Sequence, residues 1–154
     1  MNAFARVIAT WFYLGLVPKG PGTAGSIGGL AVAYALHVWA GMGAAGFGLL
    51  ALFGLMPAIW AADVTAQQTG LKDPQIVVVD EVIGQWITLA GALRFNWKTW
   101  FIALLLFRLF DIFKPPPVRQ LERVPGGAGI VLDDAMAGLY AALVLFAAGW
   151  FNRY

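Results

Sequence analysis

Five carboxylates occupy positions in the sequence from which they can meet. Asp80–Glu81 and Asp133–Asp134 each follow a short β-branched apolar run, and Asp111 lies near the end of the apolar segment between them. We expect each pair to lie at a helix N-terminus, where acids also serve simply as caps. Two pairs and a fifth acid in so apolar a chain favour function, because acids within apolar segments are costly. With no Cys and one His, such a cluster suits a hard cation, and we expect Mg²⁺.

Basic residues accompany these acids. Arg108 and Lys114 lie three residues on either side of Asp111, a spacing that places side chains on one face of a helix. They either neutralise a buried Asp or hold a phosphate, for which Arg offers a bidentate fork. Both interpretations stay open, and Arg119 and Arg123 follow in the same stretch.

Glycine-rich stretches precede two predicted helices. KGPGTAGS (19–26) leads into one and PGGAG (125–129) into the other. Such turns expose backbone N–H groups, which together with a helix N-terminus favour an anion, although a plain turn and cap explain them equally well. The candidate phosphate-binding residues are therefore Thr23, Ser26, Arg108, Lys114, Arg119 and Arg123.

The composition indicates what surrounds these groups. Of the 154 residues, 60% are hydrophobic and 12% are charged, against about 45–50% and about 25% in soluble domains. This favours an integral membrane protein, and no nucleic-acid partner is expected. The absence of Cys excludes disulfides and thiolate nucleophiles. The single histidine, His37, lies within an apolar segment, where we expect it to pack rather than to catalyse.

Five apolar segments are predicted to form helices: 26–40, 44–62, 82–93, 99–113 and 135–151. Several are shorter than the roughly 20 residues that cross a bilayer, and 82–93 is the best candidate for a re-entrant segment. The prolines of KPPP should end the fourth segment. We further expect an N-terminal interfacial helix with Trp11, Phe12 and Tyr13 at headgroup level. The predicted fold is an all-α integral membrane protein with a single domain over 1–154.

The charges predict an orientation. If the N-terminus is cytoplasmic and all five segments cross, the loops at 63–81 and 114–134 lie inside and those at 41–43 and 94–98 outside. Most Lys and Arg residues then lie inside, as the positive-inside rule requires. All eight Asp and Glu residues also lie at the cytoplasmic face, which that rule does not demand. A single site on one face explains this distribution.

Small residues add two weaker signals. Gly25 and Gly29 are spaced for close helix packing. The stretches IVVVDEVIGQW (76–86) and GIVLDDAMAGLY (129–140) are also alike: aligning Asp80 with Asp134 aligns Gly84 with Gly138. We interpret the likeness as two analogous helix starts rather than as proof of duplication.

Four motifs in order resemble the phosphatidylglycerophosphatase A family: PKGPGTAGS (18–26), DPQIVVVDEVIGQWI (73–87), FRLFDIFKPPPVR (107–119) and GGAGIVLDDAMAG (126–138). The resemblance implies a multi-pass enzyme of the bacterial inner membrane, facing the cytoplasm, that converts phosphatidylglycerophosphate to phosphatidylglycerol with Mg²⁺. The implied catalytic residues are Asp80, Glu81, Asp111, Lys114, Asp133 and Asp134, of which the five acids are the metal ligands. Thr23, Ser26, Asp73 and Arg108 match more weakly. Ala24, Pro116 and Glu122 depart from the family pattern.

Several alternatives remain at this point. A small transporter or ion channel could line a path with the same charges, and a structural subunit of a membrane complex is a third reading. A path should place ionisable residues at several depths, whereas these gather at one. For the enzyme, we favour a metal-activated water as nucleophile, with an aspartyl-phosphate intermediate as the alternative. The oligomeric state is left open.

Overall fold

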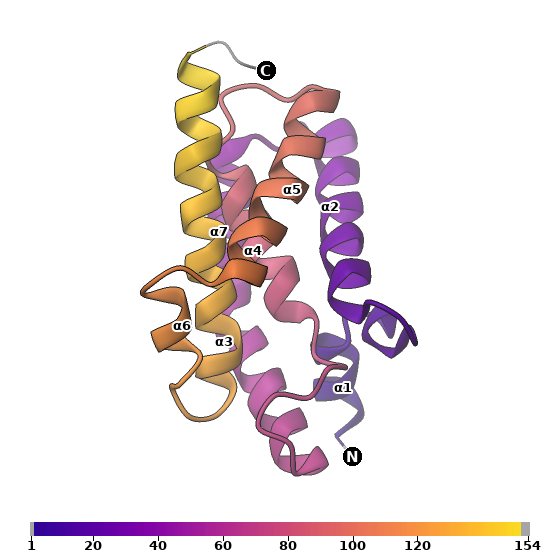
Figure 1. Ribbon diagram of the computed structural model, residues 1–154. Helices are drawn as coiled ribbons and strands as arrows, with labels where there is room; N and C mark the ends of the chain where they lie inside the picture. The colour runs from indigo at the N-terminus through magenta and orange to yellow at the C-terminus, as the bar shows by residue number, and fades with distance from the viewer. Residues whose placement is uncertain (1, 152–154) are drawn as a thin grey trace.

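The computed structural model describes residues 2–151 and is built from helices (Figure 1). Five of them contain more than ten residues, and each overlaps one of the five predicted apolar segments. The elements are α1 (Ala3–Ala9), the 3-10 helix η1 (Leu14–Leu16), α2 (Pro21–Ala40), α3 (Ala44–Thr69), α4 (Val79–Leu89), α5 (Trp97–Phe113), α6 (Val118–Leu121) and α7 (Gly127–Trp150).

The long helices alternate in direction. In Figure 1, α2, α4 and α7 run upward from the N-terminal end of the molecule, and α3 and α5 run back. The connection between α3 and α4 and the short helix α6 therefore lie toward the end that holds the N-terminus, whereas the connection between α4 and α5 lies at the opposite end with Trp150. Helix α5 ends at Phe113, directly before KPPP, as predicted.

Apolar surface on the long helices supports a membrane setting. Within the described residues, α3 and α7 are the two helices long and apolar enough to cross a bilayer. One face of α3 is exposed although its side chains are large and apolar: Leu49, Leu52, Phe53, Met56 and Trp60. Water would make such a face costly, whereas lipid tails would not. Helix α4 has 11 residues and is about 16 Å long, so it does not cross the roughly 30 Å hydrocarbon core.

Several predicted helix boundaries are wrong. Helix α2 begins at Pro21 rather than at 26, and α4 spans Val79–Leu89 rather than 82–93. Two further differences involve Asp63. Helix α3 continues past it to Thr69, because the polar residues that we took for a loop remain helical and Gln67 Nε2 donates to Asp63 Oδ2 at 2.7 Å. Helix α7 begins at Gly127, not at 135, and the Gly127 N–H donates to Asp63 Oδ1 at 3.0 Å. Asp133 and Asp134 consequently lie two turns inside α7 rather than at its N-terminus.

The predicted N-terminal helix is also shorter than expected. It ends at Ala9, and Trp11, Phe12 and Tyr13 have left-handed backbone conformations in the turn that follows. The Tyr13 N–H donates to Thr10 Oγ1 at 3.0 Å, which stabilises this turn. The three aromatic residues therefore belong to a tight turn and not to an interfacial helix, and the Trp11 ring packs 5.4 Å from that of Trp86.

Small residues allow the central helix α4 to contact its neighbours closely. A Cβ on Gly29 would lie 3.1 Å from the Val82 Cα, and a Cβ on Gly25 would lie 2.6 Å from the Val78 Cβ. These contacts confirm the packing role predicted for both glycines. His37 also packs as predicted: Nδ1 lies 2.8 Å from the Met42 carbonyl oxygen, and its ring contacts Phe95.

Candidate active site

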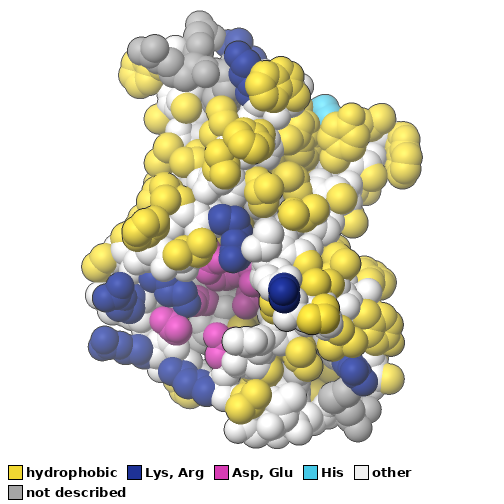
Figure 2. All heavy atoms as spheres, turned by 45° about the vertical axis from the view of Figure 1, so that its right-hand side comes forward, with side chains coloured by type: hydrophobic (Ala, Val, Ile, Leu, Met, Phe, Trp, Pro, Cys, Tyr) yellow, Lys and Arg dark blue, Asp and Glu magenta, His cyan; other side chains and the backbone are white. Residues whose placement is uncertain are grey.

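A polar cavity of about 430 Å³ opens where the start of α2, the start of α4, the end of α5 and the first half of α7 meet. Figure 2 shows acidic side chains gathered in this hollow, with basic side chains beside them and apolar surface above. The chemically active side chains of its wall are Thr23, Asp73, Asp80, Glu81, Arg108, Asp111, Lys114, Asp133 and Asp134. The predicted catalytic residues therefore share one cavity.

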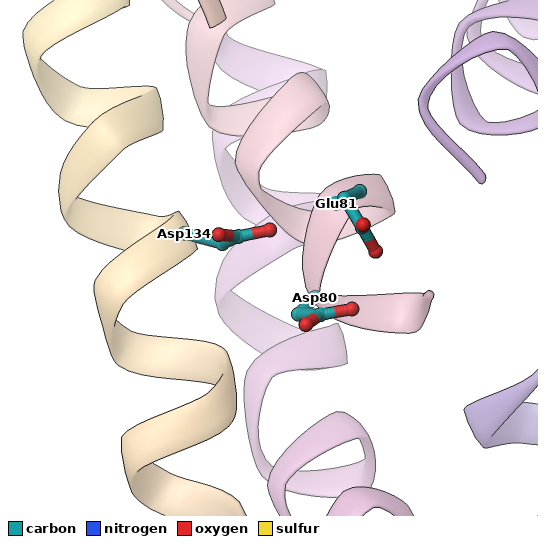
Figure 3. Close-up of side chains that lie close together, drawn as sticks. All are labelled: Asp80, Glu81 and Asp134. Carbon is teal, nitrogen blue, oxygen red and sulfur yellow. The ribbon is translucent and has the colours of Figure 1, made fainter. Parts of the chain in front are cut away.

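Three carboxylates form the centre of the site. Asp80 and Glu81 come from the first turn of α4, and Asp134 points toward them from α7 (Figure 3). Each offers an oxygen that lies within 4.8 Å of the others. Asp80 and Asp134 are only 8% and 4% exposed, and Asp80 Oδ1 and Glu81 Oε2 have no hydrogen-bond partner. Buried like charges without partners repel one another, so this arrangement fits a hard divalent cation.

A glycine crossing places these acids together. Gly84 and Gly138 each follow one of the acids, Asp80 and Asp134, by one helical turn, and the two glycines meet where α4 and α7 cross. A Cβ on Gly138 would collide with the Gly84 carbonyl oxygen, and a Cβ on Gly84 would lie 2.8 Å from the Asp134 carbonyl oxygen. Since both helices run in the same direction (Figure 1), the turns before the crossing also face each other. The two similar sequence stretches, 76–86 and 129–140, are therefore in contact with each other in the structure.

Arg108 bridges the centre to Asp111. Its Nη1 lies 2.5 Å from Asp111 Oδ2, three residues along α5, and 3.8 Å from Glu81 Oε1. Both expected interpretations of this base are therefore compatible with the geometry. Arg108 neutralises Asp111, and from the cavity wall it also presents a guanidinium to any anion that enters.

Lys114 holds the other side of the cavity. It caps α5 in a left-handed backbone conformation, and its Nζ lies 2.8 Å from Asp133 Oδ2 and 3.3 Å from Glu122 Oε1. Burial lowers the pKa of Lys114, but the hydrogen bond and charge of Asp133, with Glu122, outweigh burial and raise it above the ordinary value. The ammonium is thus charged at neutral pH, and Asp133 differs from Asp134 in having a cationic partner.

The first turn of α2 closes the cavity next to Glu81. A Cβ on Gly22 would collide with Glu81 Oε1, so only glycine lets the α2 backbone come this close. Thr23 lines the wall beside it. Ser26 does not line the cavity, because it is buried and its Oγ donates to the Gly22 carbonyl oxygen at 3.0 Å.

Other predicted phosphate contacts lie elsewhere. Arg119 and Arg123 are exposed and are not part of the cavity wall. The PGGAG turn does start α7, but Asp63 accepts the Gly127 N–H, so a carboxylate of this chain already occupies that helix start. Of the two interpretations left open for 125–129, the structure favours the plain turn and cap. The roles of Arg119 and Arg123 remain predictions.

Sequence reasoning missed two polar residues near the site. Gln75 lines the cavity. Gln85 is fully buried one turn after Glu81, and neither polar atom of its amide has a hydrogen-bond partner among the described residues. A polar side chain inside the apolar run VIGQWITLA was the available signal. Asp73, which matched only weakly, also lines the wall, and burial raises the pKa of its carboxyl above the ordinary value despite nearby Lys114.

Nearly the whole sequence is similar to those of known lipid phosphatases. The family model described as phosphatidylglycerophosphatase A matches residues 7–149. A protein of Bacteroides thetaiotaomicron named putative phosphatidylinositol-3-phosphatase is 37% identical over 94% of this chain and 92% of its own length. Phosphatidylglycerophosphatase A of Escherichia coli is 33% identical over 94% of this chain and 83% of its own length.

The phosphatidylglycerophosphatase A of Haemophilus influenzae is also 33% identical, over 92% of this chain and 86% of its own length. No solved structure matches the chain significantly. The family match covers all four motifs and the cavity residues that they contribute. The chain therefore belongs to the phosphatidylglycerophosphatase A family.

Proposed function

We propose that this protein hydrolyses the terminal phosphate monoester of phosphatidylglycerophosphate, giving phosphatidylglycerol and inorganic phosphate. We further propose that it acts as a multi-pass protein of the bacterial inner membrane, with the cavity open to the cytoplasm. The observation that carries the proposal is the group of three mostly buried carboxylates, two of which have an oxygen without a hydrogen-bond partner, beside two cationic side chains in a chain of this family. Membrane crossing by α2, α3, α5 and α7, and by α4 together with the connections on either side of it, belongs to the same proposal.

Asp80, Glu81 and Asp134 are the proposed holders of Mg²⁺, and the unpartnered oxygens of Asp80 and Glu81 fit its preference for oxygen ligands. When bound, the ion would neutralise charge on the phosphate and lower the pKa of water. Asp111 and Asp133, predicted as further ligands, contact Arg108 and Lys114. We therefore propose that Asp111 and Asp133 act in the same site by positioning Arg108 and Lys114.

The bases have a role that follows from their position. Arg108 and Lys114 lie on two sides of the cavity and present positive charge toward its interior. A phosphate monoester that enters meets both, and developing negative charge on its oxygens is stabilised by preorganised donors. Because Asp111 and Asp133 fix these side chains, little reorganisation is needed when the substrate binds.

Water is the proposed nucleophile. It attacks phosphorus, the bond from phosphorus to the glycerol oxygen breaks, and that oxygen leaves as the hydroxyl of phosphatidylglycerol once it has gained a proton. The chain has no Cys, and His37 packs against Phe95 rather than in the cavity, so neither thiolate nor imidazole chemistry is available. An aspartate nucleophile is the remaining alternative.

A transporter or channel is a poorer explanation of the same charges. Beyond the carboxylates, the buried core along α4 and α7 contains the polar residues Gln85 and Thr88 but no further ionisable side chain among the described residues. A permeation path would need ionisable residues at several depths. The described residues instead gather the acids of the cavity at one level of the molecule (Figure 2).

Phosphate release from the purified full-length chain tests the function. In mixed micelles with Mg²⁺, phosphatidylglycerophosphate should be hydrolysed well above the rate of an Asp80→Asn preparation, which controls for contaminating phosphatases. Phosphatidylinositol 3-phosphate serves as the comparison substrate, because one relative is named for it. Faster turnover of the phosphoinositide would contradict the proposed substrate.

Removal of the metal is a separate prediction. After stripping with EDTA, we expect the rate to fall by about a hundredfold or more and to recover when excess Mg²⁺ is added. Full turnover of the stripped protein in excess EDTA would exclude the metal role while leaving the substrate assignment intact.

A further inference from the structure

An apolar groove lies between α2 and α5 on the outside of the molecule. Its volume is about 240 Å³, and its wall consists of Ile27, Leu30, Ala31, Tyr34 and Trp100. The Tyr34 and Trp100 rings meet edge to face, with centroids 5.4 Å apart, and join the two helices there. Unlike the cavity, the groove has no charged side chain in its wall.

The groove continues the cavity along both helices. On α2, Thr23 lines the cavity. The groove residues of the same helix follow at steps of three or four residues, which keeps them on one face: Ile27, Leu30, Ala31 and Tyr34. On α5, Arg108 lines the cavity and Trp100 lies eight residues earlier, close to two turns away. Apolar surface above the acidic hollow is visible in Figure 2. Polar and apolar walls therefore meet end to end, as an amphiphilic ligand requires.

The distance from the cavity to the far end of the groove fits one leaflet of a bilayer. Thr23 and Tyr34 are eleven residues apart, which corresponds to about 16 Å along a helix at roughly 1.5 Å per residue. The hydrocarbon core of a bilayer is about 30 Å thick, so one leaflet contributes about 15 Å. A chain that starts at the level of Thr23 and Arg108 would thus end near the two aromatic rings.

We propose that this groove binds one acyl chain of the lipid substrate while its phosphate monoester occupies the cavity. The inference rests on the proposed function and adds how the substrate is held. Contact with an acyl chain aligns the lipid along α2 and α5 and brings the scissile bond to the depth of the carboxylates. Substrate alignment of this kind contributes to catalysis because it replaces a free encounter by a fixed geometry.

A groove-filling substitution tests the proposal. Ala31→Trp places an indole in the groove and should lower kcat/KM for dioleoyl phosphatidylglycerophosphate about tenfold relative to its dibutanoyl analogue, because two or three methylene contacts are lost. The matched control is Val144→Trp, in a second apolar groove lined by Phe110, Pro115, Pro116, Tyr140, Leu143 and Val144. This variant should keep the wild-type preference. An unchanged preference in Ala31→Trp, or an equal loss in Val144→Trp, would overturn the proposal.

A measurement without turnover separates this inference from the proposed function. The non-hydrolysable phosphonate analogue of phosphatidylglycerophosphate, carrying a photoreactive acyl chain, is cross-linked to the wild-type protein in Mg²⁺, and phosphatidylcholine with the same chain is the comparison. Labelling confined to peptides containing 27–34 and 100, and stronger for the phosphate-bearing lipid, supports the groove even if no phosphate is released in the assay above. Equal labelling by both lipids would mean that bulk lipid fills the groove, which contradicts the proposal.

Discussion

At the scale of single residues, the five acids of the cavity differ in their partners. Asp111 contacts Arg108 and Asp133 contacts Lys114, whereas the facing oxygens of Asp80 and Glu81 have no partner. A buried carboxylate without a counter-charge is costly, while one that contacts a base is much less so. The two groups should therefore respond differently when their charge is removed.

Replacing Asp80 or Asp134 by Asn should lower both Mg²⁺ affinity and phosphate release by about a hundredfold or more, because each variant removes a charged ligand while keeping its size. Asp111→Asn should lose activity with a smaller effect on ion affinity, since its contact is Arg108. Titration calorimetry and the phosphate assay measure the two effects.

Asp63→Asn is the matched control for these variants. It removes a carboxylate outside the cavity, and the Asn oxygen can still accept the Gly127 N–H. Its rate should stay within a few-fold of wild type, and thermal unfolding of all four variants should show that they fold. Wild-type ion affinity in both Asp80→Asn and Asp134→Asn would exclude the proposed ligands.

Residue types predicted the centre of the site but not its internal contacts. An apolar chain with paired acids and no Cys already pointed to a hard-cation site, and the structure brings those acids into one cavity. The pairing of Lys114 with Asp133 spans 19 residues and depends on the left-handed cap of α5, which local sequence does not reveal. Ser26 was misjudged because a hydroxyl near a helix start can equally donate to its own helix.

At the scale of elements, the crossing of α4 and α7 determines the site. Their backbones touch at Gly84 and Gly138, and Thr88 Oγ1 donates to the Gly84 carbonyl oxygen at 2.9 Å. Any side chain at either glycine must separate the helices. Since Asp80 and Asp134 each lie one turn before the crossing, the separation would also move these two acids apart.

Gly138→Ala should therefore reduce activity more than stability. Overpacking of this kind costs about 1–3 kcal/mol, whereas a shift of the facing acids should lower the rate by at least tenfold. The matched control is Gly48→Ala in α3, where a Cβ would make an ordinary contact 3.5 Å from the Ala90 Cβ. This control should be neutral or slightly stabilising, because Ala favours a helix over Gly.

Thermal unfolding in detergent and the phosphate assay compare these two variants. A Gly138→Ala protein with wild-type activity would show that the crossing does not set the ligand geometry. Equal losses in the Gly48→Ala control would point instead to general sensitivity of the bundle.

Helix positions were easier to predict than helix ends. Apolar runs located all five long helices, and the prolines fixed the end of α5. The start of α7 involves a long-range contact, from the Gly127 N–H to Asp63, which local composition does not disclose. Helix α3 continues past Asp63 with a local contact from Gln67, four residues along the helix. The similarity of the stretches 76–86 and 129–140 aligned Gly84 with Gly138, but it did not predict that the two glycines touch.

At the scale of the whole molecule, charge and apolar surface are separated. The cavity lies toward the end of the bundle that holds α1 and α6, and large apolar side chains cover the surface above it (Figures 1 and 2). The N-terminal helix and Trp150 lie at opposite ends. An odd number of crossings is consistent with this arrangement.

Single cysteines test the orientation, since the native chain has none. An impermeant thiol reagent added to spheroplasts should label Gly43→Cys and Lys98→Cys, which lie at the end opposite the cavity. Lys72→Cys and Arg123→Cys should be labelled only after permeabilisation. All four positions are exposed, so denaturation before labelling provides the control for total thiol. Labelling of positions 72 and 123 from opposite sides would contradict a single cytoplasmic site.

The crossing of α4 and α7 also has a consequence for biosynthesis. The ribosome produces Asp80 and Glu81 well before Asp134, because α5 and α6 are made in between. A nascent chain that has not yet released α7 holds two of the three central carboxylates and leaves the Gly84 face of α4 uncovered. Assembly of the site thus coincides with insertion of the last long helix, so that a chain truncated before α7 holds Asp80 and Glu81 without the third central carboxylate.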